Sequence, residues 1–393
     1  VGSNAIGMRL TSSNNNLIEE NTITSSGQHG IHIANDGSFN PSNNNIIQNN
    51  IIGSNGESGI FLDRMAGNIT IKNNVISNNK NGYFSTSSGQ QNLLINNTAS
   101  SNLEYGFRAS YFDTLTNNTA SNNTYGIVLS QGFKNNLTGN VMNANTYNFL
   151  TSAFHSFVFS SSVIDTSNTV DGKPIYYLDG ASNMVIDSST NAGFVAVMDS
   201  FNVTVRDLEL TRNGYGVVFS NISNSIIENI NASSNSQAGI LLLSSKDNIV
   251  KNNIVNGPGQ GTGIYLDSSS IGYDRSTGNL IINNTASNNE GSGIFVATGS
   301  DNATLINNTL NSNAKLLPFS TVANIMLESE NNTLIDNTMT DSLTGLWLRY
   351  SRNNILRGNS MSANQRSNFV VESTLSPYFV NDIDTSNTVE GKP

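Results

Sequence analysis

The sequence contains no cysteine, which excludes disulfide bonds and thiolate metal sites. It has 18 lysine and arginine residues against 28 aspartate and glutamate residues, a formal net charge of −10. Nucleic acids and anionic lipid surfaces attract dense basic faces, so we expect neither as a partner. No run approaches the roughly 18 apolar residues of a membrane-spanning helix, so direct membrane insertion is not expected.

Charged residues of both signs are also scarce, at 12% of the chain. This is about half the usual share, and asparagine, serine and threonine carry the missing polarity. The first ten residues, VGSNAIGMRL, lack the basic and then apolar segments of a signal peptide. They begin inside a pattern that returns later, so we expect the chain to be a mature or excised piece.

A short repeat of roughly 20 to 30 residues runs through the chain. It reads approximately N-x-I-x-x-N-x-I/A-x-x-N-x-x-x-G-I-x-L. Clear copies are NNIIQNNIIGSNGESGIFLD at 44–63, NLLINNTASSNLEYGFRA at 92–109 and GNLIINNTASNNEGSGIFVA at 278–297. Units of this kind cannot bury an apolar face alone and must stack on one another.

A longer period lies above the short one. The phrase DTSNTVDGKP begins at Asp165 and returns as DTSNTVEGKP at Asp384, 219 positions later, and Gly126 and Gly345 have the same offset. We therefore predict two tandem modules, residues 1–164 and 201–383. The segment 165–200 would join them as β-structure continuous with the solenoid, and 384–393 would start the next such segment.

The fold predicted from these repeats is all-β. Apolar and polar residues alternate over three to five positions, which is the strand period, and no window has the helical stripe. Three short strands per coil, each paired with its counterpart in the next coil, give a parallel β-helix. The recurrent Asn-Asn pairs fit its corners, where one amide of each pair should join a ladder between coils. The predicted ladder residues are Asn50, Asn74, Asn97, Asn118, Asn284 and Asn308.

The units INN(T)…N…GI.L resemble the parallel β-helix repeats of secreted carbohydrate-active proteins and of NosD-like proteins, named for a periplasmic copper-binding accessory protein. DTSNTVDGKPIYYL resembles a phrase that follows such repeats in surface proteins of methanogenic archaea. The resemblance covers essentially the whole chain and implies a right-handed solenoid at the cell surface or outside the cell. It implies no single activity, because this scaffold carries lyases, hydrolases, adhesins and wall proteins.

No catalytic group is predicted. Paired catalytic carboxylates should lie about 5 to 9.5 Å apart, whereas the candidate aspartates stand alone among polar residues and are interpreted as solvated or turn-capping. These candidates are Asp63, Asp113, Asp267 and Asp274.

No metal site or cofactor is predicted either. The three histidines, His29, His32 and His155, lack a third ligand at a suitable spacing. A calcium ion held by side-chain and backbone oxygens is left open.

A candidate binding surface for a carbohydrate or a protein partner is GLWLRYSRNN at 345–354. Its candidate residues are Trp347, Arg349, Tyr350 and Arg352. Strand alternation places Trp347 and Arg349 on one face, which suits a sugar platform or a protein contact, and a simple surface cation–π pair is the alternative. Tyr105, Tyr111 and Tyr125 are further candidates for an aromatic stripe.

N-x-S/T sequons recur, and a glycan requires an amide that points into solvent. The candidate glycosylation sites outside the predicted ladder are Asn68, Asn122, Asn136, Asn202, Asn221, Asn231, Asn302 and Asn332.

The leading hypothesis is a non-enzymatic extracellular structural or interaction protein of a surface layer, sheath or filament. It would associate with itself end to end or laterally, because the strand edges at both ends of a β-helix invite pairing. The alternative is a carbohydrate-binding or carbohydrate-processing β-helix, lyase-like or hydrolase-like. A NosD-type copper accessory protein is the third hypothesis.

Overall fold

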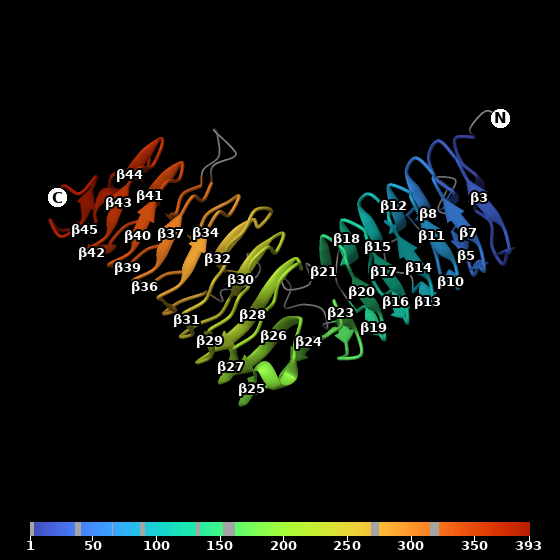
Figure 1. Cartoon of the computed structure of the whole chain (residues 1–393), viewed down its shortest axis with the longest axis horizontal. Helices are drawn as coiled ribbons and strands as arrows, with labels where there is room; N and C mark the ends of the chain where they lie inside the picture. Colours follow the sequence, from blue (N-terminus) through green and yellow to red (C-terminus); the bar gives the residue numbers. More distant parts are fainter. Residues whose placement is uncertain are drawn as a thin grey trace. The chain divides into compact units, whose positions relative to one another are not determined.

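The computed structural model describes residues 4–35, 41–64, 66–86, 91–130, 134–151, 162–268, 275–314 and 322–393. In these residues it contains short β-strands, two 3₁₀ turns and no α-helix. Figure 1 shows the strands of successive coils lying side by side within each of two compact units, residues 1–177 and 178–393. The division falls within the segment predicted to join two modules. No helix in the described parts of the chain is long and apolar enough to cross a membrane.

The first unit consists of three parallel sheets. The first holds β1 (Met8–Thr11), β4 (Ile31–Ala34), β8 (Ser58–Leu62), β12 (Asn81–Ser85), β15 (Tyr105–Ala109), β18 (Tyr125–Leu129) and β21 (Tyr147–Thr151). The second holds β2 (Leu17–Glu19), β6 (Ile46–Gln48), β10 (Thr70–Lys72), β13 (Leu93–Ile95), β16 (Thr114–Thr116), β19 (Asn136–Thr138) and β22 (Val163–Ile164). The third holds β3 (Thr22–Thr24), β7 (Ile51–Gly53), β11 (Val75–Ser77), β14 (Thr98–Ser100), β17 (Thr119–Ser121), β20 (Val141–Asn143) and β23 (Thr169–Val170). A short pair, β5 (Ser42–Asn43) and β9 (Ala66–Gly67), lies at one corner.

The second unit repeats the plan with longer strands in one sheet. This sheet holds β26 (Phe194–Phe201), β28 (Tyr215–Ser223), β30 (Ala238–Leu243), β32 (Thr262–Asp267), β35 (Ile294–Val296), β38 (Ile325–Leu327), β41 (Thr344–Arg349) and β44 (Ser367–Glu372). Another holds β25 (Met184–Ile186), β27 (Val203–Arg206), β29 (Ile226–Glu228), β31 (Ile249–Lys251), β33 (Leu280–Ile282), β36 (Thr304–Ile306), β39 (Thr333–Ile335), β42 (Ile355–Arg357) and β45 (Asp382–Ile383). The third holds β34 (Thr285–Ser287), β37 (Thr309–Asn311), β40 (Thr338–Thr340), β43 (Ser360–Ser362) and β46 (Thr388–Val389). The 3₁₀ turns are η2 (Ser188–Thr190) and η3 (Ser376–Phe379).

One strand crosses the boundary between the units. β24 (Lys173–Asp179) turns back on β23 as an antiparallel pair, with Thr169 opposite Pro174. The turn falls at Asp171 and Gly172, both with positive φ, in the DGKP phrase. The predicted module limits at residues 164 and 200 stay a prediction.

The core is a set of stacked columns of inward side chains. In the first unit the register aligns Ile31, Ile60, Tyr83, Phe107, Ile127 and Phe149, all fully buried. In the second unit Val217, Ile240, Ile264, Ile294, Ile325 and Leu346 align in the same way and are also fully buried. Each coil gains its core only from its neighbours, as the repeat predicted.

The Asn-Asn pairs form the corners as predicted. The first residue of a pair takes the left-handed conformation that bends the chain; the φ of Asn96 is 53° and that of Asn117 is 54°. The second residue points inward and is buried, as Asn97 and Asn118 are. The predicted parallel β-helix with three short strands per coil and asparagine ladders is therefore confirmed.

Candidate functional site

A column of aromatic side chains runs along the outer face of the sheet from β1 to β21. We call it the aromatic ladder, and its members are His29, Phe61, Phe84, Tyr105, Tyr125 and Tyr147. Successive ring centroids are 4.6, 5.8, 6.1, 5.6 and 5.2 Å apart. All six side chains are partly exposed, so the ladder is a surface of this unit.

The ladder follows from two outward positions in each repeat. Tyr105 precedes a glycine of the repeat, and Phe84 lies two positions after the corresponding glycine. The glycine lets the backbone pass closely; a Cβ on Gly106 would lie 2.7 Å from the carbonyl oxygen of Gly126. Because coils stack in register, Phe61 and Phe84 align in one column and Tyr105, Tyr125 and Tyr147 align in a second. The two columns meet where the rings of Phe84 and Tyr105 lie 6.1 Å apart.

The rings are tilted where the surface is hollow. The interplanar angle is 57° between Phe61 and Phe84 and 58° between Phe84 and Tyr105, against 30° between Tyr105 and Tyr125. A hollow of about 410 Å³ opens at this point. It is lined by His29, Glu57, Ser58, Phe61, Lys80, Asn81, Phe84, Glu104, Tyr105 and Arg108. Tilted rings leave part of their faces uncovered by their neighbours, and these faces line the hollow.

Charged side chains flank the rings. The Nζ of Lys80 lies 3.5 Å from a carboxylate oxygen of Glu57 and 3.8 Å from one of Glu104. The guanidinium carbon of Arg108 lies 4.5 Å from the centroid of Phe84 and 5.9 Å from that of Tyr105. The two carboxylates thus share one ammonium group, while the guanidinium is held against rings.

The two histidines at the start of the ladder behave as aromatic surfaces. Burial lowers the pKa of His29 and of His32 below the usual value, so both rings are neutral at neutral pH. The Nδ1 of His29 accepts a hydrogen bond from the backbone N–H of Ser58 at 3.3 Å. Within the described ranges, no three histidine, aspartate or glutamate side chains are grouped to hold a metal ion. His155 lies outside the described residues.

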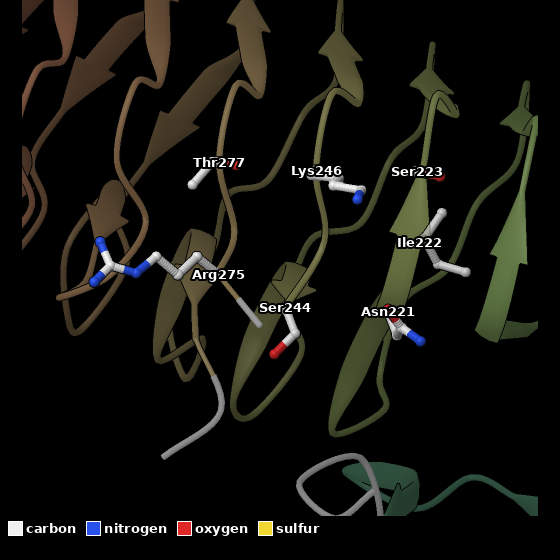
Figure 2. Close-up of a pocket in the computed structure, with 7 residues that line it drawn as sticks. All are labelled: Asn221, Ile222, Ser223, Ser244, Lys246, Arg275 and Thr277. Atoms are coloured by element: carbon white, nitrogen blue, oxygen red, sulfur yellow. The ribbon is translucent and has the colours of Figure 1, made fainter. Parts of the chain in front are cut away.

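A second hollow of about 300 Å³ lies on the second unit and crosses three neighbouring coils. It is lined by Asn221, Ile222, Ser223, Ser244, Lys246, Arg275 and Thr277 (Figure 2). Figure 2 shows Arg275 extending away from Lys246, and its guanidinium pairs with Asp301 at 2.8 Å. The two cations do not converge, so this hollow is the weaker candidate.

The predicted platform at Trp347 is not an exposed one. Alternation holds, with Leu346 and Leu348 facing the core, but the outward Trp347 is only 5% exposed. It packs with Ala323 and Met326, because the outward column of this sheet is itself apolar. The prediction of an exposed sugar platform at Trp347 is therefore wrong.

The other residues of that predicted patch are engaged in ion pairs and ring contacts. Arg349 pairs with Glu328 at 2.6 Å and Arg352 with Glu330 at 2.9 Å. Tyr350 is 39% exposed, and its ring centroid lies 6.1 Å from that of Tyr378. Binding of a partner by Arg349, Tyr350 and Arg352 stays a prediction.

Two of the candidate aspartates cap turns as expected. Asp63 accepts from the backbone N–H of Arg64 at 2.7 Å, and Asp267 accepts from that of Ser268 at 2.8 Å. Asp274 lies outside the described residues.

Asp113 is not a solvated carboxylate, because it is fully buried, although it does accept a hydrogen bond from the backbone N–H of Ser110 at 3.1 Å across a turn. It takes the place of an asparagine in a corner ladder, between Asn92 at 2.9 Å and Asn135 at 2.8 Å. Burial raises the pKa of Asp113 to about 6.

The predicted ladder is present and a second one accompanies it. Asn50, Asn74, Asn97 and Asn118 are linked by Nδ2 to Oδ1 bonds of 2.9–3.0 Å, and Asn284 donates to Asn308 at 3.0 Å. The second ladder, at another corner, joins Asn55, Asn79, Asn102, Asn123 and Asn145. Sequence reasoning missed it, although its asparagines recur five residues after those of the first.

The candidate glycosylation sites differ in exposure. Asn68, Asn122, Asn136, Asn202, Asn221 and Asn302 are exposed, and Asn231 is partly exposed. Asn332 is instead fully buried in a ladder, where its Nδ2 donates to Asn354 at 3.1 Å. Its prediction as a glycosylation site is wrong, because its amide is buried and because the sequon here, Asn331-Asn332-Thr333, has the exposed Asn331 as its acceptor.

Comparison with known families agrees with this architecture. The family described as right handed beta helix region matches residues 4–190 and 158–310, which is more than half of the chain. The chain belongs to this family. A second family, periplasmic copper-binding protein (NosD), matches residues 268–390, so the chain is a NosD-like parallel β-helix protein, and its predicted right-handed coil is confirmed. No curated protein matches the chain at significant similarity.

Several solved structures are similar to the chain at low identity and low TM-score. They include an alginate lyase from Paenibacillus sp. str. FPU-7, at 13% identity and TM-score 0.40, covering 70% of this chain and 90% of that one. Another is the A-module of the mannuronan C-5 epimerase AlgE4 from Azotobacter vinelandii, at 13% identity and TM-score 0.32. The match covers 94% of this chain and 91% of that one. PfbA, a surface adhesin of Streptococcus pneumoniae, matches at 12% identity and TM-score 0.33. The match covers 91% of this chain and 82% of that one. Such values say nothing of this chain's activity.

Proposed function

We propose that this chain is an extracellular or periplasmic β-helix that binds a glycan along its aromatic ladder without turning it over. The observation that carries the proposal is the ladder itself, with its hollow beside Phe61, Phe84 and Tyr105. Five steps of the coil spacing of ~4.8 Å give a length of roughly 24 Å, which suits an extended chain rather than a single small molecule.

Ring faces and polar groups alternate in the hollow as a sugar requires. A sugar ring has apolar C–H faces that stack on aromatic rings and hydroxyl edges that need donors and acceptors. Phe84 and Tyr105 offer the rings, while Asn81, Glu57 and Glu104 offer hydrogen-bonding groups at the rim. Asn81 and Phe84 lie on β12 and Tyr105 lies on β15, and these strands hold the side chains in place before the ligand arrives.

Binding without turnover is supported by how the carboxylates are held. Glu57 and Glu104 both face Lys80, at 3.5 and 3.8 Å, so neither is placed as an isolated acid or base. The copper-accessory hypothesis gains no support from the described residues, which group no three suitable ligands. Assembly into a layer, sheath or filament stays a prediction that this single chain leaves open.

The experiment is a glycan microarray followed by titration of each hit with the wild type, Tyr105→Ala and Tyr111→Ala. Tyr111 is the matched control, since its ring contacts Phe112 and lies outside the ladder. We expect Tyr105→Ala to weaken binding about tenfold, the loss of one stacking ring, and Tyr111→Ala to leave it unchanged. The absence of any glycan ligand, or new reducing ends after incubation, would contradict the proposal.

A further inference from the structure

Arg108 is the arginine that lines the hollow of the aromatic ladder. Five others pair with carboxylates. These are Arg206 with Asp187, Arg275 with Asp301, Arg349 with Glu328, Arg352 with Glu330 and Arg357 with Asp382, at 2.6–3.5 Å. Arg108 forms no ion pair with any residue that the structure describes, although the chain carries an excess of ten negative charges.

The guanidinium of Arg108 is instead held by the aromatic ladder. Its carbon atom lies 4.5 Å from the Phe84 centroid, within the range of a cation–π contact, and the side chain is partly buried. Such a contact satisfies the charge through the ring but leaves the N–H groups of the guanidinium without acceptors. Arg108 lines the hollow, and the planar fork of donors in a guanidinium can meet two oxygens of an anion.

The carboxylates nearest to this position are already engaged. Glu57 and Glu104 also line the hollow, but both are within ion-pair distance of Lys80. The lining of the hollow therefore contains two carboxylates that share one ammonium group, and one guanidinium that has no carboxylate partner among the described residues. Because the chain as a whole repels anions, an unpaired cation at this one place determines whether an anionic sugar is accepted.

We propose that the ladder selects glycans with an anionic substituent, the carboxylate of a uronic acid or a sulfate ester, and that Arg108 binds this group while Phe84 and Tyr105 stack on the sugar ring. This inference rests on the proposed glycan binding and names the ligand class of the same site. The selection acts through one residue, so it is separable from stacking.

The experiment uses glycans in matched pairs that differ only in charge. Polygalacturonate, polyglucuronate and polymannuronate are each titrated beside the carboxyl-reduced polymer, and dextran sulfate is titrated beside dextran. The proteins are the wild type, Arg108→Gln, Arg108→Lys and the control Arg64→Gln, whose side chain lies on an exposed turn outside the hollow. Thermal melting verifies that all four are folded.

We expect the wild type to bind the charged member of at least one pair about tenfold or more tightly than its neutral partner, the range of a charge-assisted hydrogen bond. Arg108→Gln should remove this ratio and spare the neutral glycan, Arg108→Lys should keep part of it, and Arg64→Gln should keep all of it. The carboxylate and sulfate pairs show which anion is preferred.

Three results would count against the inference in different ways. Equal binding of charged and neutral members by the wild type would overturn the selection of an anion but leave glycan binding in place. A ratio that survives Arg108→Gln would overturn the role of Arg108. No binding of any member, and of any glycan on the array, would overturn the proposed function and this inference together.

Discussion

The Nδ2 of Asn97 lies 2.9 Å from the Oδ1 of Asn118, and the backbone N–H of Asn97 lies 3.0 Å from the same oxygen. The buried amide of Asn118 therefore satisfies two donors of the coil before it, and the Nδ2 of Asn97 has a second acceptor in the carbonyl oxygen of Ile71 at 2.8 Å. Because every corner must place polar backbone groups beside an apolar core, these amides make the stacking of coils specific.

Asn97→Ala should destabilise the chain by about 3 kcal/mol. The backbone N–H and the Nδ2 of Asn74, which both donate to Asn97 at 3.0 Å, would lose their acceptor in the interior. The measurement is urea unfolding, with Asn136→Ala as the control because Asn136 is exposed at the start of β19. A loss no larger than that of the control would show that the ladder is not what holds the corners.

Gly106→Ala should cost about 2 kcal/mol through overpacking. The new Cβ would lie 2.7 Å from the Gly126 carbonyl oxygen and 2.9 Å from the Nδ2 of Asn123, and neither can retreat without disturbing a ladder. Gly27→Ala is the matched control, since its nearest neighbour would be at 3.7 Å. Equal melting temperatures for the two variants would be evidence against close stacking at Gly106.

The stability of the chain should depend on pH through Asp113. Burial raises the pKa of this carboxyl from 3.8 to about 6, so the folded state holds the proton more tightly than the unfolded state. The contribution of Asp113 to the free energy of unfolding is greatest below about pH 4. It falls by about 3 kcal/mol as the pH rises from about 4 to 6, and it is constant at higher pH.

The comparison of wild type with Asp113→Asn isolates this effect from other carboxyls. The variant should lose the decline between about pH 4 and 6, because an amide does not titrate. Its absolute stability changes separately, because the N–H of Ser110, 3.1 Å from a carboxylate oxygen of Asp113, loses its acceptor. Free energies of unfolding at pH 4, 5, 6 and 7 provide the test. Parallel profiles for the two proteins would mean that Asp113 does not titrate in the interior.

Much of the fold was predictable because its determinants are local and repeated. An Asn-Asn pair encodes both a left-handed bend and an inward amide, so Asn96 with Asn97 marks a corner without any knowledge of the rest. The exact place of a buried carboxylate was not predictable. Asp113 is recognisable only once the coils are aligned and it falls between Asn92 and Asn135.

The candidate site was predictable only in part. Tyr105 and Tyr125 were expected in an aromatic stripe and do lie 5.6 Å apart, whereas Tyr111 lies outside it. Phe61 and Phe84 were missed because a phenylalanine in a strand suggests core until its outward position is known. The prediction that Trp347 is exposed was wrong for the opposite reason. Its side chain does point outward, but the outward column of its sheet is apolar and buries it.

The central claim, that a glycan lies lengthwise along the ladder, is tested most directly by affinity as a function of oligosaccharide length. For a bound glycan class, we expect the dissociation constant to fall from disaccharide to hexasaccharide. Tyr125→Ala, which changes a ring outside the hollow, should weaken the long ligands and spare the short ones. An affinity that is already complete at the disaccharide and indifferent to Tyr125 would contradict the account.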